Sequence, residues 1–347
     1  MTSSPESQRS RPSAGATPRR VLVTGGAGFI GSHLTDLLLA RGDHVTVVDD
    51  LSTGRRTNLP ASHERLRFIE ADLGHALDAF GKGERFDEAY HLAAAVGVKL
   101  IMADQVRSIE TNVEQTARLL RFAISRSPSG GGIPTLLASS SEVYGKSTKS
   151  PFSEDDDAVY GPTTIGRWSY ACSKAIDEYL GLAYARQHGL PVVVARFFNT
   201  VGPRQVGEYG MVLPRFVRAA MQGEALSVFG DGSQSRCFCD VRDVAEVLPR
   251  MLASDSCRGR VLNVGSDRPI SIAALADAVI RTLGSRSTKR FIPYTEAYPA
   301  GFEDLQQRQP DLRRIRAALT FTPRRELEQT IRDIAAHTGA GPGGGTP

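Results

Sequence analysis

Two short segments of this chain carry residue types that could do chemistry together. Tyr170 and Lys174 stand in one segment, and Ser140, Ser141 and Glu142 stand in the other. Residues four apart share one face of a helix, so the Lys174 ammonium can lie beside the Tyr170 phenol and favour its ionised form. Such a phenol can take a proton from a substrate hydroxyl near neutral pH. What the Glu142 carboxylate does then decides which reaction follows.

Alternating strands and helices position these segments. Buried helical stretches are expected at 29–40, 103–126 and 168–188, and short apolar runs predict strands at 21–23, 45–48, 66–69, 88–92, 135–138, 191–196 and 261–264. This alternation predicts an α/β fold with a Rossmann-type, doubly wound parallel sheet that is covered on both faces. Less regular stretches, rich in Pro, Gly and Arg, are expected to form a smaller C-terminal lobe over the carboxyl ends of the strands.

A glycine-rich turn follows the first predicted strand. Gly25, Gly28 and Gly31 are spaced three and three. The first permits a tight turn, the second lets the backbone approach a pyrophosphate, and the third packs helix on strand. Asp49 ends the next strand about 20 residues later, where a carboxylate accepts hydrogen bonds from a ribose 2′-hydroxyl and repels a 2′-phosphate. We therefore expect NAD, rather than NADP, as the cofactor.

Further cofactor contacts are expected beside this turn. Asp72 is placed to reach the adenine edge, or equally to cap the helix that begins at Leu73. Small residues after the fourth strand either lie beside the cofactor or serve close packing. The predicted cofactor set is Gly25, Gly28, Phe29, Ile30, Gly31, Asp49, Asp50, Ser52, Thr53, Gly54, Asp72, Leu73, Leu92, Ala93, Ala94, Tyr170 and Lys174.

The domain boundaries follow from these patterns. Residues 1–18 are rich in Ser, Pro and Arg and predict a disordered arm, and 336–347 predict a flexible tail. We expect 19–200 with 236–267 to form the NAD-binding domain. Residues 201–235 with 268–335 are expected to form a substrate-binding lobe.

Bulk composition narrows the class of protein. The net charge of +4 is small for 347 residues and gives no reason to expect nucleic acid as a partner. No apolar run reaches the roughly 18 residues of a membrane helix, so no membrane partner is expected. The four cysteines lack metal-site spacing, so no metal is expected, and they are interpreted as reduced thiols of a cytoplasmic protein.

Several motifs, in order, resemble those of the extended short-chain dehydrogenase/reductase family, which includes nucleotide-sugar epimerases, dehydratases and decarboxylases. The resemblance runs from about Arg20 to Ile334. It includes the glycine loop, His91-Leu-Ala-Ala, Tyr-x-x-x-Lys, Arg196-Phe-Phe-Asn199, Gly202-Pro-Arg204 and Phe229-Gly-Asp-Gly232 followed by Arg236.

The resemblance implies a UDP-sugar substrate and a set of residues that bind it. Asn199 would contact the nucleotide diphosphate, and Phe229 would lie near the uracil. Arg236 and Arg308 would hold the diphosphate or the sugar, as guanidinium groups suit phosphate and carboxylate oxygens. A turn role for Asn199 and a core role for Phe229 stay open. The implied substrate set is Asn199, Arg204, Val212, Phe229, Arg236 and Arg308.

Ser139-Ser-Ser-Glu-Val-Tyr-Gly145 distinguishes the branches of this family. It looks like the UDP-glucuronate decarboxylases, as do Arg167-Trp168 and the segment 302–311. The 4,6-dehydratases usually carry an acidic residue where Ser141 stands, and simple 4-epimerases usually carry no glutamate at 142. The resemblance therefore implies NAD-dependent decarboxylation of UDP-glucuronate to UDP-xylose, by C4 oxidation, loss of CO₂ and re-reduction.

The implied catalytic set is Tyr170, Lys174, Ser140, Ser141, Glu142 and Arg236. Tyr170 would take the C4 hydroxyl proton, Ser140 would bond the same hydroxyl, and Glu142 with Arg236 would position the sugar and its carboxylate. Glu142 could instead be a helix cap or an ion-pair partner. The alternative activities are 4-epimerisation of UDP-glucose or UDP-glucuronate, 4,6-dehydration of dTDP-glucose, and nucleotide sensing without catalysis.

Helices 103–126 and 168–188 each have an apolar stripe. In the family that these motifs resemble, such helices pair across a two-fold axis, which implies a homodimer. Alternatively, both stripes face only the sheet.

Overall fold

The computed structural model describes residues 17–94, 104–126, 131–207, 211–297 and 306–339. Most of the expected arm (1–18) and of the expected tail (336–347) lies outside these ranges, although 336–339 form the end of helix α11 (Leu327–Gly339). No helix in the described part of the chain is long and apolar enough to cross a membrane.

A seven-stranded parallel sheet forms the centre of the protein, as expected. Its strands match the predicted runs to within a few residues. The inner strands are apolar enough to be largely buried on both faces, whereas the edge strand of residues 66–70 is only partly buried. In spatial order they are β11 (Arg260–Val264), β6 (Val192–Phe197), β5 (Thr135–Ser140), β4 (Glu88–His91), β1 (Arg20–Thr24), β2 (His44–Asp49) and β3 (Leu66–Glu70).

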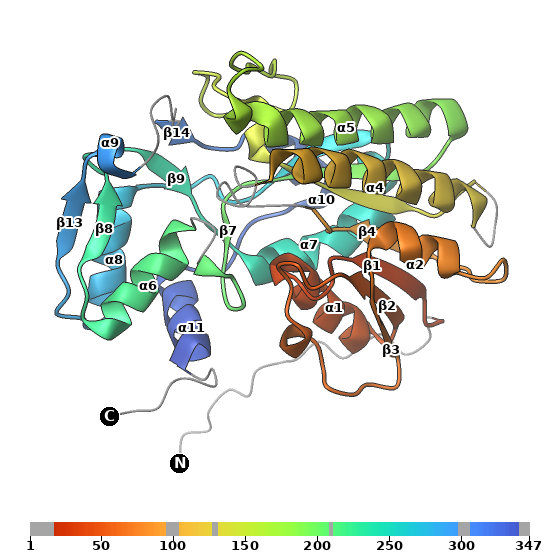
Figure 1. Cartoon of the computed structure of the whole chain (residues 1–347), viewed down its shortest axis with the longest axis horizontal. Coiled ribbons are helices and arrows are strands. Elements are labelled where there is room, and N and C mark those ends of the chain that lie inside the picture. The colour runs from red at the N-terminus through yellow and green to blue at the C-terminus, as the bar shows by residue number, and fades with distance from the viewer. Residues whose placement is uncertain (1–16, 95–103, 127–130, 208–210, 298–305, 340–347) are drawn as a thin grey trace.

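Helices cover both faces of the sheet (Figure 1). Alternate strand residues point to opposite faces, so Val21 and Val23 of β1 pack into one core and Leu22 into the other. The first core includes α1 (Phe29–Arg41), α7 (Val241–Ala253) and α10 (Arg313–Leu319). The second includes α2 (Leu73–Ala79), α4 (Gln105–Ser125) and α5 (Ser169–His188). Helices α4 and α5 pack side by side, in the positions predicted for them.

A third hydrophobic cluster lies apart from the sheet, toward the left in Figure 1. It is built from α6 (Val212–Gln222), β8 (Leu226–Phe229), α8 (Ile272–Leu283) and α11. Short strands surround it: β7 (Thr200–Val201) pairs with β10 (Cys239–Asp240), and β13 (Lys289–Ile292) pairs with β8. Strand β9 (Ser235–Cys237) lies between β12 (Pro269–Ser271) and β14 (Gln307–Arg308), and the short helix α9 (Tyr294–Ala297) follows β13. Helices α6 and α8 and strands β8, β12, β13 and β14 lie within the two stretches expected to form the smaller lobe. Strand β10 and most of β9 instead lie within 236–267, which was expected to belong to the NAD-binding domain.

Candidate active site

A cavity of about 1110 Å³ opens where the carboxyl ends of the strands meet the third cluster. It brings together every predicted cofactor, catalytic and substrate residue except Gly54. A β-carbon on Gly54 would come 2.8 Å from Asp49 Oδ1, so this glycine packs behind the Asp49 carboxylate and does not line the cavity.

The glycine turn has the geometry that its spacing predicts. Gly25 has φ +70°, and a β-carbon there would come 2.6 Å from Ala93 N at the end of β4. A β-carbon on Gly31 would collide with the Gly25 carbonyl oxygen. Both positions therefore need glycine. Helix α1 begins at Phe29, so its N-terminal N–H groups and dipole face the cavity, which suits a pyrophosphate.

Two carboxylates border the cofactor side of the cavity. Asp49 accepts hydrogen bonds from the N–H groups of Ala27 and Leu51, both at 2.9 Å, while burial raises the pKa of its carboxyl. Asp72 caps α2 through the Gly74 N–H at 2.8 Å and also lines the cavity, so both predicted roles are compatible. The second Asp72 oxygen accepts from Gln115 Nε2 at 2.7 Å.

Unpaired polar atoms show that these walls suit a polar ligand. Gln115 Oε1 is buried without a hydrogen-bond partner among the described residues, and so is Asn199 Nδ2. Both residues line the cavity. Buried polar atoms cost free energy when unpaired, so a dinucleotide and a nucleotide sugar would supply what these side chains lack. Gln115 was not predicted from the sequence, because an amide within a helix gives no local signal.

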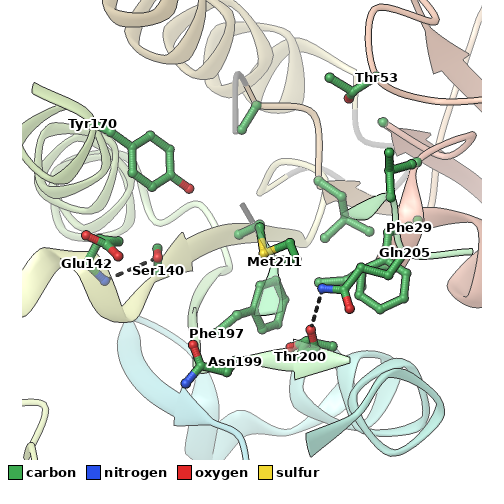
Figure 2. A pocket seen from close by; sticks show the side chains of 18 of the residues that line it. Phe29, Thr53, Ser140, Glu142, Tyr170, Phe197, Asn199, Thr200, Gln205 and Met211 are labelled. Carbon is green, nitrogen blue, oxygen red and sulfur yellow. Dashed lines mark hydrogen bonds between the residues drawn. The ribbon is translucent and has the colours of Figure 1, made fainter. Parts of the chain in front are cut away.

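Helix α5 carries the tyrosine and lysine to the cavity. Figure 2 shows the Tyr170 phenol pointing from α5 into the cavity, near Ser140 and Glu142. Burial raises the pKa of Tyr170, whereas Lys174 and a hydrogen bond with Ser140 work in the opposite direction. The expected direction of the lysine effect is therefore confirmed. The expectation of a net lowered phenol pKa is wrong for the protein without ligands, because desolvation outweighs the lysine charge.

Lys174 has a partner that sequence reasoning missed. Its Nζ donates to Asp177 Oδ2 at 3.0 Å, and both side chains are buried. Burial alone would lower the pKa of Lys174, but the Asp177 charge raises it. Residues three apart on a helix are neighbours, so the signal was present in the spacing.

Glu142 lies between two guanidinium groups. Its Oε2 is 2.8 Å from Arg167 Nη2, and its Oε1 accepts from Arg308 Nη1 at 2.6 Å. Burial alone would raise the pKa of Glu142, but Arg308 and Arg167 outweigh it and lower this pKa to about 2. The alternative role as an ion-pair partner is therefore confirmed. Glu142 stays ionised and cannot donate a proton near neutral pH.

The other substrate-side residues come from four separate elements and one turn. In the pairing of β9 with β14, Arg236 lies directly beside Arg308. Phe229 ends β8 and lines the cavity with the Arg215 guanidinium 4.6 Å from its ring centroid, so it is not simply core. Val212 begins α6. Arg204 lines the cavity but also pairs with Asp36 of α1 at 2.7 Å, a contact that sequence reasoning did not predict.

The loop around Ser141 and the loop after β2 complete the set. Ser140 caps the 3₁₀ turn 141–144 by accepting from the Glu142 N–H at 3.2 Å, and Ser141 is buried at the cavity edge. Asp50 is exposed and accepts from both the N–H and the hydroxyl of Ser52. Among the described residues, no group of three or more His, Cys, Asp or Glu side chains could hold a metal ion.

Comparisons with known proteins agree with this geometry. Residues 21–265 match the NAD dependent epimerase/dehydratase family. The chain is 40% identical over 316 residues to the UDP-N-acetyl-alpha-D-glucosaminuronate decarboxylase of Bacillus cytotoxicus, covering 91% of this chain and 96% of that protein. It is 36% identical over 316 residues to UDP-glucuronic acid decarboxylase 1 of Danio rerio, covering 90% of this chain and 71% of that protein.

A solved structure shares the whole architecture. An epimerase from Methanothermobacter thermautotrophicus superimposes with a TM-score of 0.83 at 26% identity, covering 92% of each chain. The matched family model spans the glycine turn, Tyr170 and Lys174, which are the residues that the geometry places around the dinucleotide side of the cavity. The chain therefore belongs to the NAD-dependent epimerase/dehydratase family, and its cofactor is NAD.

Proposed function

We propose that this protein is an NAD-dependent decarboxylase that converts UDP-glucuronate to UDP-xylose. The observation that supports this most is the arrangement of Glu142 between Arg167 and Arg308. One carboxylate and two guanidinium groups leave a net positive charge at the cavity wall near Tyr170. Such a wall suits the carboxylate of a uronic acid better than the hydroxymethyl group of a neutral hexose.

Each of these two arginines also has an N–H group that could donate to a substrate. Arg167 Nε and Arg308 Nε are buried with no hydrogen-bond partner among the residues that the structure describes, and both side chains line the cavity. A carboxylate on C6 of the sugar would give such donors an acceptor. We assign Glu142 to holding the two guanidinium groups in place, and Arg236, beside Arg308 in the β9–β14 pair, to the diphosphate or sugar.

The bacterial relative at 40% identity favours a second substrate of the same class. That protein is named for UDP-N-acetyl-alpha-D-glucosaminuronate, which differs from UDP-glucuronate at C2 of the sugar. The carboxylate and the C4 hydroxyl are common to both sugars, so the same arginines and the same base serve both. The proposed reaction is decarboxylation of a UDP-uronic acid, and turnover measurements decide between the two substrates.

The first step is oxidation at C4. Tyr170 takes the proton of the C4 hydroxyl, while Ser140 holds the same oxygen by a hydrogen bond. NAD, held beside the glycine turn and Asp49, would supply the acceptor for the C4 hydride. Lys174 lowers the pKa of Tyr170 within the buried site and so assists this proton transfer.

The second step is loss of CO₂. Oxidation leaves the carboxylate β to a ketone, so the C5–C6 bond can break and its electron pair can pass to the C4 oxygen as an enolate. The hydroxyl groups of Tyr170 and Ser140 lie where they can stabilise this oxygen. A proton from water is then added to C5. Tyr170 returns its proton to the C4 oxygen, and hydride return to C4 from the bound cofactor would restore the hydroxyl. Glu142 does not supply that proton, because its pKa of about 2 keeps it ionised.

The competing activities make different demands on these residues. A 4,6-dehydratase needs an acid that protonates the leaving C6 hydroxyl, and Ser141 and ionised Glu142 supply none. A 4-epimerase uses the same base but must let the oxidised sugar turn over in the cavity. The structural similarity to an epimerase favours keeping this second candidate. Its product, a UDP-hexuronate formed without CO₂, distinguishes it.

Direct assays test the proposal. The protein is incubated with NAD and, in separate reactions, UDP-glucuronate, its N-acetyl analogue and UDP-glucose, and CO₂ and nucleotide sugars are followed. We expect CO₂ and a UDP-pentose from at least one uronic acid and no turnover of UDP-glucose. Conversion of UDP-glucose to UDP-galactose would refute the decarboxylase and favour the epimerase.

We also propose that the chain works as two units and as a homodimer. Residues 19–200 with 236–267 would bind NAD, and 201–235 with 268–335 would bind the UDP-sugar.

Helices α4 and α5 expose apolar side chains away from the sheet, with Val106 at 67% exposure and Tyr179 at 74%. Such a surface suits pairing of two copies. Light scattering after gel filtration should give twice the mass of the chain.

We propose a cytoplasmic location because none of the four cysteines forms a disulfide. All four are free thiols, and Cys237, Cys239 and Cys257 are buried. Free thiols of this kind are typical of a reducing compartment.

A further inference from the structure

Lys174 is paired with a carboxylate that the proposed reaction does not use. Asp177 lies three residues further along α5, and its Oδ2 is 3.0 Å from Lys174 Nζ. Both side chains are only 3% exposed, so water does not screen them. An ion pair of this kind leaves each charge with a weaker effect on its surroundings than it would have alone. Asp177 therefore changes what Lys174 can do for Tyr170.

The Asp177 carboxylate has few other donors. Its second oxygen, Oδ1, is buried with no hydrogen-bond partner in the described part of the chain. Burial raises the pKa of Asp177, while the ammonium of Lys174 and the nearby Thr116 hydroxyl of α4 act in the opposite direction. A structural salt bridge would normally satisfy both carboxylate oxygens. Here, instead, the main contact of the Asp177 carboxylate is with Lys174.

Neutral groups enclose the pair on the side of the sheet. His91 Nε2, at the end of β4, lies 3.2 Å from Thr116 Oγ1, and His91 Nδ1 lies 2.7 Å from Thr24 Oγ1. Burial, with a further contribution from Lys174, lowers the pKa of His91 to about 3, so its ring is uncharged near neutral pH. The described groups joined by these contacts are therefore uncharged and do not offset Asp177.

The charges that reach the phenol of Tyr170 come from two elements. Burial raises the pKa of Tyr170 most. Among the charges, Lys174 on α5 lowers this pKa, Glu142 in the turn after β5 raises it, and Asp177 on α5 raises it to a smaller extent. Glu178 of α5 faces Lys174 as well. It forms its own buried salt bridge with an arginine of β6, at 2.7 Å. Asp177 is therefore the carboxylate whose charge acts most directly on the lysine.

We propose that Asp177 is a positioning residue, which fixes the ammonium of Lys174 and offsets part of its charge at Tyr170, and so acts together with burial to keep the phenol protonated until sugar and cofactor are bound. This inference rests on the proposed role of Tyr170 as the base. It does not depend on whether the later step is decarboxylation or epimerisation. Replacing Asp177 by Asn removes the charge and keeps the size of the side chain.

The test is an ultraviolet titration of tyrosinate in the protein without substrate. The signal of Tyr170 is the difference between each protein and the same protein carrying Tyr170→Phe. We expect Asp177→Asn to shift the Tyr170 titration to lower pH, and Asp177→Glu, which keeps the charge, to shift it less. An unchanged titration, or a shift to higher pH, would overturn the proposal. A failure of decarboxylation would leave this result unaffected, so the two claims are tested separately.

A second pair of variants covers the case in which Asp177→Asn does not fold. Lys174→Met keeps the Asp177 carboxylate, whereas the double variant Lys174→Met/Asp177→Asn lacks it. The double variant therefore has no unpaired charge at residues 174 and 177. The double variant should titrate Tyr170 at lower pH than Lys174→Met alone. Equal titrations in this pair would show that the Asp177 charge does not reach the phenol, and would equally overturn the proposal.

Discussion

Arg308 Nη1 donates to Glu142 Oε1 at 2.6 Å, which joins two segments that are 166 residues apart in the sequence. Glu142 follows β5 in the central sheet, whereas Arg308 ends β14 beside β9. The contact therefore ties the smaller set of strands to the edge of the sheet where Tyr170 acts. It also places a guanidinium group beside the cavity, where a substrate carboxylate can reach it.

Replacing Arg308 by Gln should reduce kcat/KM for the uronic acid by roughly two to three orders of magnitude, because losing one partner of a buried charge pair costs about 2–5 kcal/mol. The affinity for UDP alone, measured by calorimetry, should change little if Arg308 serves the sugar carboxylate. Arg313→Gln is the matched control, since that side chain is 88% exposed. An equal loss of UDP affinity in Arg308→Gln would place this arginine on the diphosphate instead.

Replacing Tyr170 by Phe should lower turnover of every substrate by at least about 10²–10⁴-fold, because Tyr170 is the described residue to which we assign removal of the C4 hydroxyl proton. Tyr179→Phe, on the same helix but 74% exposed, should keep full activity. Quenching of protein fluorescence by NAD would show that Tyr170→Phe still binds the cofactor. Turnover by Tyr170→Phe at the wild-type rate would refute the shared first step.

Glu142 should make the stability of the protein depend on pH in the acid range. Its pKa is lowered from 4.5 to about 2 in the folded protein, so its ionised form stabilises the fold above about pH 4.5. This contribution, about 3 kcal/mol at about 1.4 kcal/mol for each pH unit, should disappear as the pH falls toward 2. Urea unfolding of wild type and Glu142→Gln measures it.

The difference in free energy of unfolding between these two proteins should be largest near neutral pH and should shrink below pH 4.5. A difference that stays constant from pH 7 to pH 3 would mean that Glu142 is not held ionised by Arg167 and Arg308.

Asp49 should decide the choice of cofactor. Fluorescence titration of the wild-type protein should show tighter binding of NAD than of NADP, because the buried carboxylate repels a 2′-phosphate. Asp49→Asn removes the charge while its side-chain oxygen can still accept from the Ala27 N–H. In this variant, the ratio of the Kd for NADP to the Kd for NAD should fall by about tenfold or more. Glu64→Gln, at a carboxylate that is 80% exposed and does not line the cavity, should leave the preference nearly unchanged. Tighter NADP binding by wild type would contradict the assignment.

The features predicted well from the sequence are those with a local cause. Apolar runs specify buried strands, and glycines at 25, 28 and 31 specify a turn in which side chains would collide with backbone. The same holds for Tyr170 and Lys174, whose spacing alone places them on one helical face. These patterns need no knowledge of distant contacts.

The features that escaped prediction depend on contacts between distant segments or on burial. The two arginines around Glu142 come from the turn before α5 and from β14, and nothing near residue 142 indicates that they meet there. The pairing of Arg204 with Asp36 has the same origin. Burial also reversed the net direction of the Tyr170 pKa, because sequence shows a neighbouring charge but not the desolvation that opposes it.

The most direct test of the central claim is the fate of C6 of the sugar. The protein is supplied with NAD and UDP-glucuronate labelled with ¹³C at C6, or its N-acetyl analogue labelled in the same way, and the reaction is followed by nuclear magnetic resonance. The account predicts that labelled CO₂ and an unlabelled UDP-pentose accumulate in equal amounts, and that Arg308→Gln slows both. Label that remains in a UDP-hexuronate epimerised at C4, with no CO₂ released, would contradict it.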